Sequence, residues 1–368
     1  MRVAVTLEQC WHRVPGGTAR AAIEQVRAVA ARGDVDQVGV SARHREGPEE
    51  AWVPPIEVRQ LPLPRLALYE SWHHLGRPPV ERATGPVDVV HATGVAVPPR
   101  TAPLVVTVHD LAVLHDPDQF TRRGVSFMRK AIELTAARAD LVLCSSRATL
   151  DDCRVQGFPS ERLRLVPLGV AAEEATADEV ARVRQSYGLT GRYVLFVGTI
   201  EPRKNLRGLL DAFRRVTSTP ELADVTLALV GPPGWGEDLA PRVAALGDRC
   251  RTLGFVPTDD LRALHAGADA FCYPSLLEGF GLPVLEAMVQ GTPVVTSAGT
   301  ATEELVEGGA GLAVPPRDPA AIAAALVEVL TDEDVARSLG EAGRRRSQQY
   351  TWARTAELVV DAYRDAAG

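Results

Sequence analysis

The stretch that decides the fold is DAFCYPSLLEGFGLPVLEAMVQG, residues 269–291. It begins with an apolar run, typical of a buried strand, that ends at Ser275, and a glycine-containing loop follows. Pro283 suits the first turn of a helix, and Gly291 suits the position just after its end. The stretch therefore predicts a strand, a loop and a helix in succession, whose free amides form an anion site.

Two glutamates flank this predicted anion site. Glu278 stands in the loop, and Glu286 stands one turn into the helix, eight residues later. A carboxylate can accept hydrogen bonds from two neighbouring sugar hydroxyls. Either glutamate alone could be a surface residue or one favoured by the helix dipole. The whole arrangement favours a site for a phosphate-bearing sugar.

Outward from this stretch, short β-branched runs alternate with helical segments along the chain. Several runs, such as LVVTV at 104–108 and YVLFV at 193–197, are apolar without a break, which is typical of parallel strands covered on both faces. The strands predicted in the first half are 3–7, 36–40, 57–61, 87–92, 104–109, 141–145 and 163–168. Those in the second half are 193–198, 226–231, 250–255, 269–274, 293–297 and 311–314. The pattern predicts an α/β protein with two doubly wound, Rossmann-like domains.

An acidic, alanine-rich stretch near 170–176 separates the two series of strands. We therefore expect an N-terminal domain at 1–172 and a C-terminal domain at 173–350. The remaining residues, 351–368, form an amphipathic segment that predicts a terminal helix.

Composition narrows the class of protein. The chain has 368 residues and a net charge of −7, which argues against a general nucleic-acid binder. Its five cysteines contain no CxxC pair and indicate buried thiols in a reducing compartment. No apolar run is long enough for a membrane span, and the first residues do not resemble a signal peptide. We expect a cytoplasmic protein.

The loop EPRKN at 201–205 holds one of only two lysines in the chain, Lys204, and its only asparagine, Asn205. Beside Lys204, Arg203 adds a planar cation, so the two can converge on a diphosphate. The retention of a lysine in an arginine-rich chain favours a specific need for Lys204, with chance as the alternative. Asn205 is expected to cap the following helix, 206–215, in preference to contacting a ligand.

Taken together, these segments resemble the retaining GT-B glycosyltransferases of the family-4 type. The match covers nearly the full chain and is strongest from 190 to 330. Its motifs are EGFGLPVLEAMVQGTPVVTS, FVGTIEPRKNLRGLLDAF at 196–213, LVGPPGWG at 229–236, LGFVPTDDLRALHAGADAF at 253–271, PGGTAR at 15–20, VTVHD at 106–110 and the closing TWARTAELVVDAYRD. The GTIEPRKNL variant is most similar to mannosyltransferases that use GDP-mannose.

The resemblance implies two domains that face each other across a cleft, with the terminal helix returning to the first domain. It implies transfer of a hexose from a GDP-mannose or UDP-hexose type of donor to a hydroxyl acceptor, by a front-face mechanism without metal or cofactor. It places catalysis on His109, Arg203, Lys204 and Glu278. The residues that it assigns to the nucleotide sugar are Gly17, Gly198, Arg203, Lys204, Gly231, Phe255, Val256, Glu278, Gly279, Phe280, Gly281, Leu282 and Glu286.

The first domain supplies weaker signals. Gly17 belongs to a Pro15–Thr18 loop expected to precede a helix from Ala19. His109 ends the strand LVVTVHD at the edge where α/β sheets bind ligands, and is expected to contact a sugar hydroxyl. A strand-end histidine satisfied by backbone is the alternative. His91 ends another strand and is a further candidate for the acceptor side.

Three DxD triplets, at 34–36, 116–118 and 332–334, are predicted to be turns and helix caps and not metal sites. Residues 122–138 form a basic amphipathic segment. A solvated basic face is the favoured interpretation, and peripheral contact with the inner face of a membrane is the alternative.

Two other functions stay open on the sequence. A sugar-nucleotide epimerase or hydrolase of the same fold would act on the donor without an acceptor. A catalytically silent sugar-nucleotide-binding protein would bind the donor without turnover, although the complete set of Arg203, Lys204, Glu278 and Glu286 argues against it.

Overall fold

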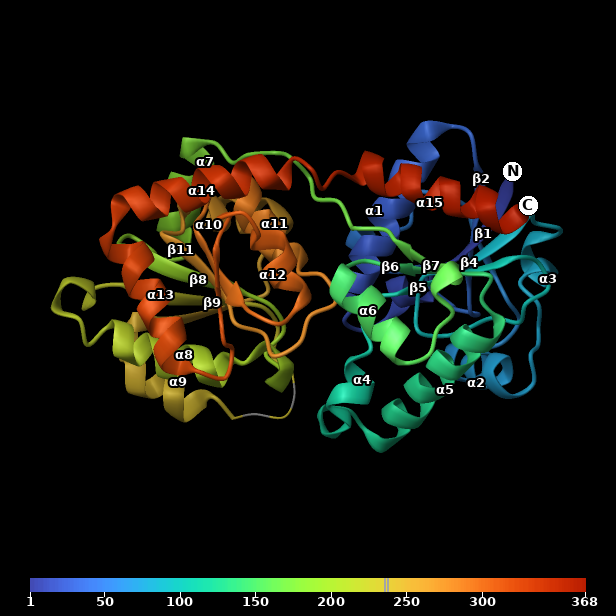
Figure 1. Ribbon diagram of the computed structural model, residues 1–368, viewed down its shortest axis with the longest axis horizontal. Helices are drawn as coiled ribbons and strands as arrows, with labels where there is room; N and C mark the ends of the chain where they lie inside the picture. The colour runs from blue at the N-terminus through green and yellow to red at the C-terminus, as the bar shows by residue number, and fades with distance from the viewer. Residues whose placement is uncertain (235, 237) are drawn as a thin grey trace. The chain divides into compact units, whose positions relative to one another are not determined.

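The computed structural model describes residues 1–234, 236 and 238–368, which form two compact units. Unit 1 contains residues 1–169 and 350–368, and unit 2 contains residues 170–349. Each unit is built on one parallel sheet with helices packed against it (Figure 1). The predicted α/β class with two Rossmann-like domains is confirmed.

The sheet of unit 1 has seven strands in the order β3-β2-β1-β4-β5-β6-β7. The strands are β1 Arg2–Thr6, β2 Asp36–Ser41, β3 Val58–Gln60, β4 Val89–Ala92, β5 Leu104–Val108, β6 Leu141–Cys144 and β7 Leu163–Leu165. The helices are α1 Gly16–Arg32, α2 Arg65–His74, α3 Glu81–Thr84, α4 Ala112–His115, α5 Arg122–Arg138, α6 Arg147–Val155 and α15 Trp352–Ala367. The strand order reverses between β1 and β4, and such reversals are where open α/β sheets bind ligands.

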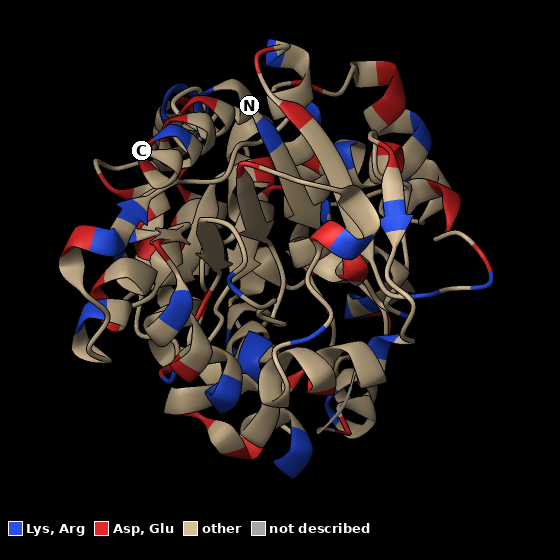
Figure 2. Ribbon diagram, turned by 90° about the vertical axis from the view of Figure 1, so that its right-hand side faces the viewer, with Lys and Arg blue, Asp and Glu red and all other residues tan. Residues whose placement is uncertain are grey.

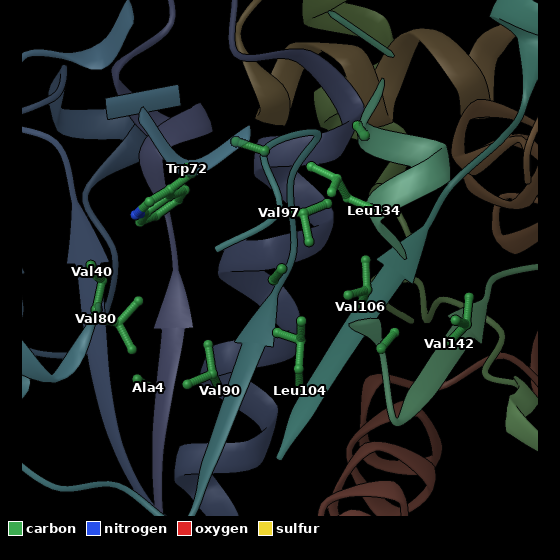
Figure 3. Close-up of a cluster of buried hydrophobic side chains, with 14 of the residues drawn as sticks. Ala4, Val40, Trp72, Val80, Val90, Val97, Leu104, Val106, Leu134 and Val142 are labelled. Atoms are coloured by element: carbon green, nitrogen blue, oxygen red, sulfur yellow. The ribbon is translucent and has the colours of Figure 1, made fainter. Parts of the chain in front are cut away.

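Apolar side chains cover both faces of this sheet. Val90 and Val106 point to the face on which Trp72 of α2 and Leu134 of α5 pack (Figure 3). Val105, next to Val106, belongs to the cluster on the opposite face, with residues of α1 and α15. Neighbouring strand residues are therefore buried on opposite faces, which explains why β5 is apolar at every position except Thr107.

The terminal helix α15 belongs to unit 1. Its buried face joins the same cluster as α1, and Tyr363 is fully buried there. The Tyr363 hydroxyl lies 2.8 Å from Nδ1 of His91 on β4. Gly169 lets the start of α15 approach, because a Cβ there would lie 2.2 Å from the Trp352 nitrogen. The terminal helix thus completes the core of unit 1.

Unit 2 repeats the plan with six strands in the order β10-β9-β8-β11-β12-β13. The strands are β8 Tyr193–Val197, β9 Thr226–Val230, β10 Cys250–Gly254, β11 Ala270–Tyr273, β12 Val294–Ser297 and β13 Leu312–Val314. The helices are α7 Ala177–Ser186, α8 Leu206–Val216, α9 Ala240–Leu246, α10 Thr258–Gly267, α11 Leu282–Val289, α12 Ala301–Val306, α13 Pro319–Thr331 and α14 Glu333–Ser347. Here the order reverses between β8 and β11. Within the described part of the chain, no helix is long and apolar enough to cross a bilayer.

Candidate active site

The loops after β8 and β11 meet at the point where the strand order of unit 2 reverses. Gly198 directly follows β8, and a short 3-10 turn, Pro202–Lys204, leads into α8. After β11, residues 274–281 connect to α11. The backbone nitrogen of Leu276 donates to the carbonyl of Arg203 at 2.8 Å, which ties the two loops together. Residues 73 positions apart in the chain, Arg203 and Leu276, therefore share one edge of the sheet.

Lys204 is the centre of a buried cluster of charged groups at this edge. Its side chain is 10% exposed, and its ammonium lies 2.6 Å from Oε1 of Glu278 and 2.6 Å from the hydroxyl of Tyr273. Arg203 approaches the same Glu278 oxygen at 3.4 Å and pairs with Glu201 at 2.9 Å. Three residues predicted to be catalytic, Arg203, Lys204 and Glu278, thus lie in direct contact.

The cluster is ionised at neutral pH because its charges outweigh the cost of burial. Burial acts to raise the pKa of Glu278, but the charges of Lys204 and Arg203 prevail and lower that pKa to about 2. Burial likewise acts to lower the pKa of Lys204, but Glu278 and Tyr273 together outweigh burial, so the pKa is raised. A preorganised pair of cations around a carboxylate suits a site in which charge develops during a reaction.

Asn205 fixes the loop that carries the two cations. It takes the left-handed backbone conformation, with φ of 54°, and is the N-cap of α8, accepting a hydrogen bond from the Gly208 nitrogen at 3.2 Å. Its amide nitrogen also donates to the carbonyls of Pro274 and Pro316. The predicted cap is confirmed, and the same side chain holds three segments of unit 2 together.

Glycines allow the loops at this edge to approach closely. Gly231 follows β9 with φ of +140°, and a Cβ there would lie 2.0 Å from the Gly198 carbonyl oxygen. Gly281 precedes α11 with φ of +105°, and a Cβ would lie 2.5 Å from the Thr302 side chain. The predicted residues Gly279 and Phe280 belong to the same turn, with Phe280 buried, and Leu282 is the first residue of α11. Trp235 of the LVGPPGWG motif lies outside the described residues.

Glu286 has surroundings of its own. It lies on α11, 13% exposed, and its Oε2 is 3.9 Å from Nε2 of the buried His265 on α10. Glu278 is instead in contact with the two cations. The two carboxylates are therefore suited to different tasks.

The loop after β10 presents an exposed aromatic ring. Phe255 is 77% exposed, whereas its neighbour Val256 is buried. The Gly231 nitrogen donates to the Gly254 carbonyl at 2.8 Å, so this loop adjoins the glycine turn after β9. An exposed ring at a ligand-binding edge can stack on a planar base.

In unit 1, His109 directly follows β5 and is partly buried. Its ring hydrogen-bonds to the backbone of Thr93, and Nε2 is buried with no partner among residues 1–234, 236 and 238–368. Burial lowers its pKa, and Asp110 offsets this only in part. A neutral imidazole with an open nitrogen can bond a hydroxyl group.

Two expectations for unit 1 need correction. Helix α1 begins at Gly16 and not near Ala19, so Gly17 stands in the first helical turn and not in a loop. A Cβ would fit at Gly17, because no other atom lies within 4 Å of one placed there, so packing does not require a glycine at this position. His91 does not face a ligand, because it is fully buried between Tyr363 and Thr107 at 2.8 Å each.

Aspartates of the DxD triplets cap a helix or form ion pairs with arginines. Asp332 is the N-cap of α14, accepting from the nitrogens of Asp334 and Val335 at 3.0 Å each. Asp34 pairs with Arg32 and Arg364. Among residues 1–234, 236 and 238–368, no group of three or more histidine, cysteine or acidic side chains is placed to hold a metal ion.

Three residues of the site were not predicted from the sequence. Tyr273 and Glu201 contact the two cations, and His265 lies beside Glu286. Tyr273 ends a strand at the ligand edge and could have been proposed from that position. Nothing local marks His265, because its proximity to Glu286 depends on how α10 and α11 pack.

Comparisons with known proteins cover both units. Residues 15–174 match the family described as Glycosyltransferase Family 4, and residues 179–346 match Glycosyl transferases group 1. O-antigen chain mannosyltransferase B of Escherichia coli is 33% identical over 283 residues, which cover 75% of this chain and 74% of the relative. MMP alpha-(1->4)-mannosyltransferase of Mycolicibacterium hassiacum is 30% identical over 304 residues, covering 77% and 71%.

A solved structure extends the similarity in fold to almost the whole chain. The crystal structure of Anabaena HepE in complex with UDP and glucose aligns with a TM-score of 0.78 at 21% identity, covering 99% of this chain and 100% of that chain.

Proposed function

This chain belongs to the family-4 glycosyltransferases of the GT-B fold, and we propose that it moves a hexose from a nucleotide-diphosphate sugar to a hydroxyl acceptor with retention of configuration. We propose mannose, carried on GDP, as the first choice of donor. The two curated relatives named above are mannosyltransferases, which supports that choice. A UDP-hexose is the second choice, because the HepE crystals hold UDP and glucose.

The observation that carries this proposal is the buried contact of Lys204 with Glu278, at 2.6 Å, beside Arg203. In the proposed reaction the donor diphosphate leaves as the bond from the sugar C1 to its phosphate oxygen breaks. Lys204 and Arg203 stabilise the negative charge that grows on the phosphate, so their effect is largest in the transition state. Lys204 does so as a point charge and Arg203 as a planar fork.

The acceptor hydroxyl attacks C1 from the face that the phosphate leaves. Its oxygen forms the new bond to C1, and its proton passes to the departing phosphate oxygen, so atoms and charges balance without a covalent enzyme intermediate. Glu278 accepts hydrogen bonds from hydroxyls of the transferred sugar and orients the ammonium of Lys204. We propose that these residues do this work without a metal ion or a cofactor.

The remaining site residues bind and position the donor in this proposal. Glu286 holds the ribose hydroxyls, and Phe255 and Val256 contact the base. The glycine turns at Gly198, Gly231 and 279–281 leave room for the diphosphate near backbone amides. From unit 1, the open Nε2 of His109 accepts from a sugar hydroxyl, and the open space beside Gly17 in the first turn of α1 leaves room for the donor.

The deciding experiment compares nucleotides first and turnover second. Thermal unfolding is measured with GDP, UDP and ADP, since a ligand at about 100 times its dissociation constant stabilises by about 2.7 kcal/mol. The sugar nucleotide of the preferred base is then incubated with and without a panel of hydroxyl acceptors. Acceptor-dependent release of the nucleoside diphosphate is expected. Epimerised or hydrolysed sugar from donor alone would instead support the epimerase or hydrolase, and binding without turnover the silent binder.

A further inference from the structure

Unit 1 contains a pocket that the proposed transfer does not use. It lies between α2 and α5, has a volume of about 470 Å³, and is lined by four basic residues of α5 and two histidines of α2. These residues are Arg122, Arg123, Arg129, Lys130, His73 and His74, and two carboxylates, Glu70 and Glu133, also line the pocket. Volumes of this size are usual for small-molecule sites.

The positive charge of the pocket is only partly neutralised. Arg123 pairs with Glu70 at 3.0 Å, and Lys130 pairs with Glu133 at 3.1 Å. In the described part of the chain no carboxylate pairs with Arg122 or Arg129. These two arginines are seven residues apart on α5 and so lie on one face of it.

A buried donor on the wall of the pocket also lacks a partner. His73 is 3% exposed, and its Nε2 accepts a hydrogen bond from the Val97 nitrogen at 3.2 Å. Burial lowers the pKa of His73 to about 4, so the ring is neutral and its single hydrogen is on Nδ1. Nδ1 is buried and has no partner within residues 1–234, 236 and 238–368. Buried donors are usually satisfied, so this one points to a missing ligand.

We propose that the pocket between α2 and α5 binds the phosphate group of an organic phosphate. Arginine forks match phosphate oxygens in pairs, and Arg122 and Arg129 are available for that contact. The Nδ1 hydrogen of His73 supplies a neutral donor on the wall. Phe127, whose ring stacks on His73 at 4.3 Å, supplies an apolar surface for the organic part.

The geometry favours a discrete ligand over a flat charged surface. In Figure 2, which looks onto the side of unit 1, acidic positions are interspersed with basic ones along the ribbon. The N-cap of α5 is also satisfied, since the Thr121 side chain accepts from the Gly124 nitrogen at 3.1 Å. The site therefore depends on converging side chains and not on the helix terminus.

In the test, the 368-residue chain is labelled with ¹⁵N at its histidines and titrated with glycerol 3-phosphate and with inorganic phosphate. The His73 resonance should shift on binding. The double variant Arg122→Gln/Arg129→Gln should weaken the affinity by at least about tenfold, because two charged hydrogen-bonding groups are lost. The matched control, Arg337→Gln/Arg345→Gln, removes two exposed arginines of α14 and should bind like the wild type. All four substitutions are on the surface, and the melting temperature reports whether the fold is kept.

A second arm separates the sources of the phosphate. Vesicles of phosphatidylcholine with phosphatidic acid are compared with vesicles containing phosphatidylserine at equal charge. Selective binding to phosphatidic acid that the double variant loses supports a lipid phosphate in the pocket, and a response to soluble phosphate alone supports a free one. Equal binding to both kinds of vesicle with no His73 shift would overturn the proposal in favour of a non-selective basic surface. Unchanged affinity in the double variant, or no binding to any probe, would also overturn it.

Discussion

Substitutions of Lys204 test whether the site needs a compact positive charge. Its ammonium contacts Glu278 and Tyr273 at 2.6 Å each in a nearly closed environment, where a larger, planar guanidinium would not fit without movement. Lys204→Ala should lower kcat at least about 100-fold, since it removes charge stabilisation of the leaving group. Lys204→Arg should restore only part of the rate. Steady-state kinetics on both variants, with the exposed Arg345→Ala as control, give the answer, and a fully active Lys204→Arg enzyme would contradict the argument.

Substitutions of Glu278 and of Glu286 should change different kinetic constants, because the two residues have different proposed partners. Ribose hydroxyls do not change in the reaction, so Glu286→Gln should mainly raise the donor KM and weaken binding of the free nucleoside diphosphate. The transferred sugar gains positive character, so Glu278→Gln should mainly lower kcat. Its affinity for the diphosphate, which lacks the sugar, should stay close to wild type. Calorimetric titration of both variants decides, and a greater loss of diphosphate affinity in Glu278→Gln would reverse the two assignments.

The ionised state of Glu278 predicts a window of pH dependence. Its pKa is about 2 in the folded protein, below the ordinary value of 4.5, so its contribution to stability is complete above pH 4.5 and is lost as the pH falls towards 2. The difference in free energy of unfolding between wild type and Glu278→Gln should be constant from pH 5 to 9 and shrink below pH 4.5. Urea unfolding across this range measures it. A difference that changes with pH between 5 and 9 would mean that the carboxylate titrates there.

At the scale of elements, Asn205 joins the start of α8 to two other loops. Asn205→Ala removes the cap and two donated hydrogen bonds, and should destabilise unit 2 by about 2–3 kcal/mol. Asn205→Asp keeps the cap but loses both amide donors, and Asn205→Gly keeps the left-handed backbone but loses all side-chain contacts. Thermal unfolding should rank Gly as the mildest of the three changes, because Asp turns a carboxylate oxygen toward the carbonyls of Pro274 and Pro316 and Ala is strained at a φ of 54°. A Gly variant no more stable than the Ala variant would contradict this ranking, because it would show that the left-handed backbone costs alanine nothing.

The helices and strands could be predicted from the sequence because each depends mainly on residues close together in the chain. All 13 strands expected from apolar runs are present, and Asn205 and Gly291 stand where a cap and a helix end were expected. The start of α1 was misplaced because two glycines usually indicate a turn, yet Gly16 already begins the helix. The contacts of His91 with Tyr363 and of Glu286 with His265 depend on packing between distant segments, which no local pattern encodes.

At the scale of the whole molecule, the chain builds one topology twice from different sequences. Each unit reverses its strand order beside its first strand, at β1 with β4 and at β8 with β11. At each reversal, loops from neighbouring strands meet at the carboxyl edge of the sheet, and the candidate site residues of unit 2 are concentrated at this edge. The units differ in how their cores are completed, because unit 1 takes its last helix, α15, from the far end of the chain. Its stability therefore depends on residues that follow all of unit 2.

Because α15 completes the core of unit 1, removing the buried hydroxyl of Tyr363 on α15 should destabilise unit 1 and leave unit 2 unaffected. Tyr363→Phe removes the contact with His91 at 2.8 Å and leaves a buried imidazole nitrogen with one partner fewer, which should destabilise unit 1 by about 1–3 kcal/mol. The matched control is Tyr187→Phe in unit 2, whose hydroxyl bonds Asp260 at 3.0 Å in a more exposed setting and should matter less. Hydrogen exchange resolved by segment should show faster exchange in β1, β4 and β5 for Tyr363→Phe, with β8 and β11 unchanged and nucleoside diphosphate binding retained. Equal acceleration in both sheets would mean that the units unfold as one cooperative body, and the separate contribution of α15 to unit 1 would then have to be abandoned.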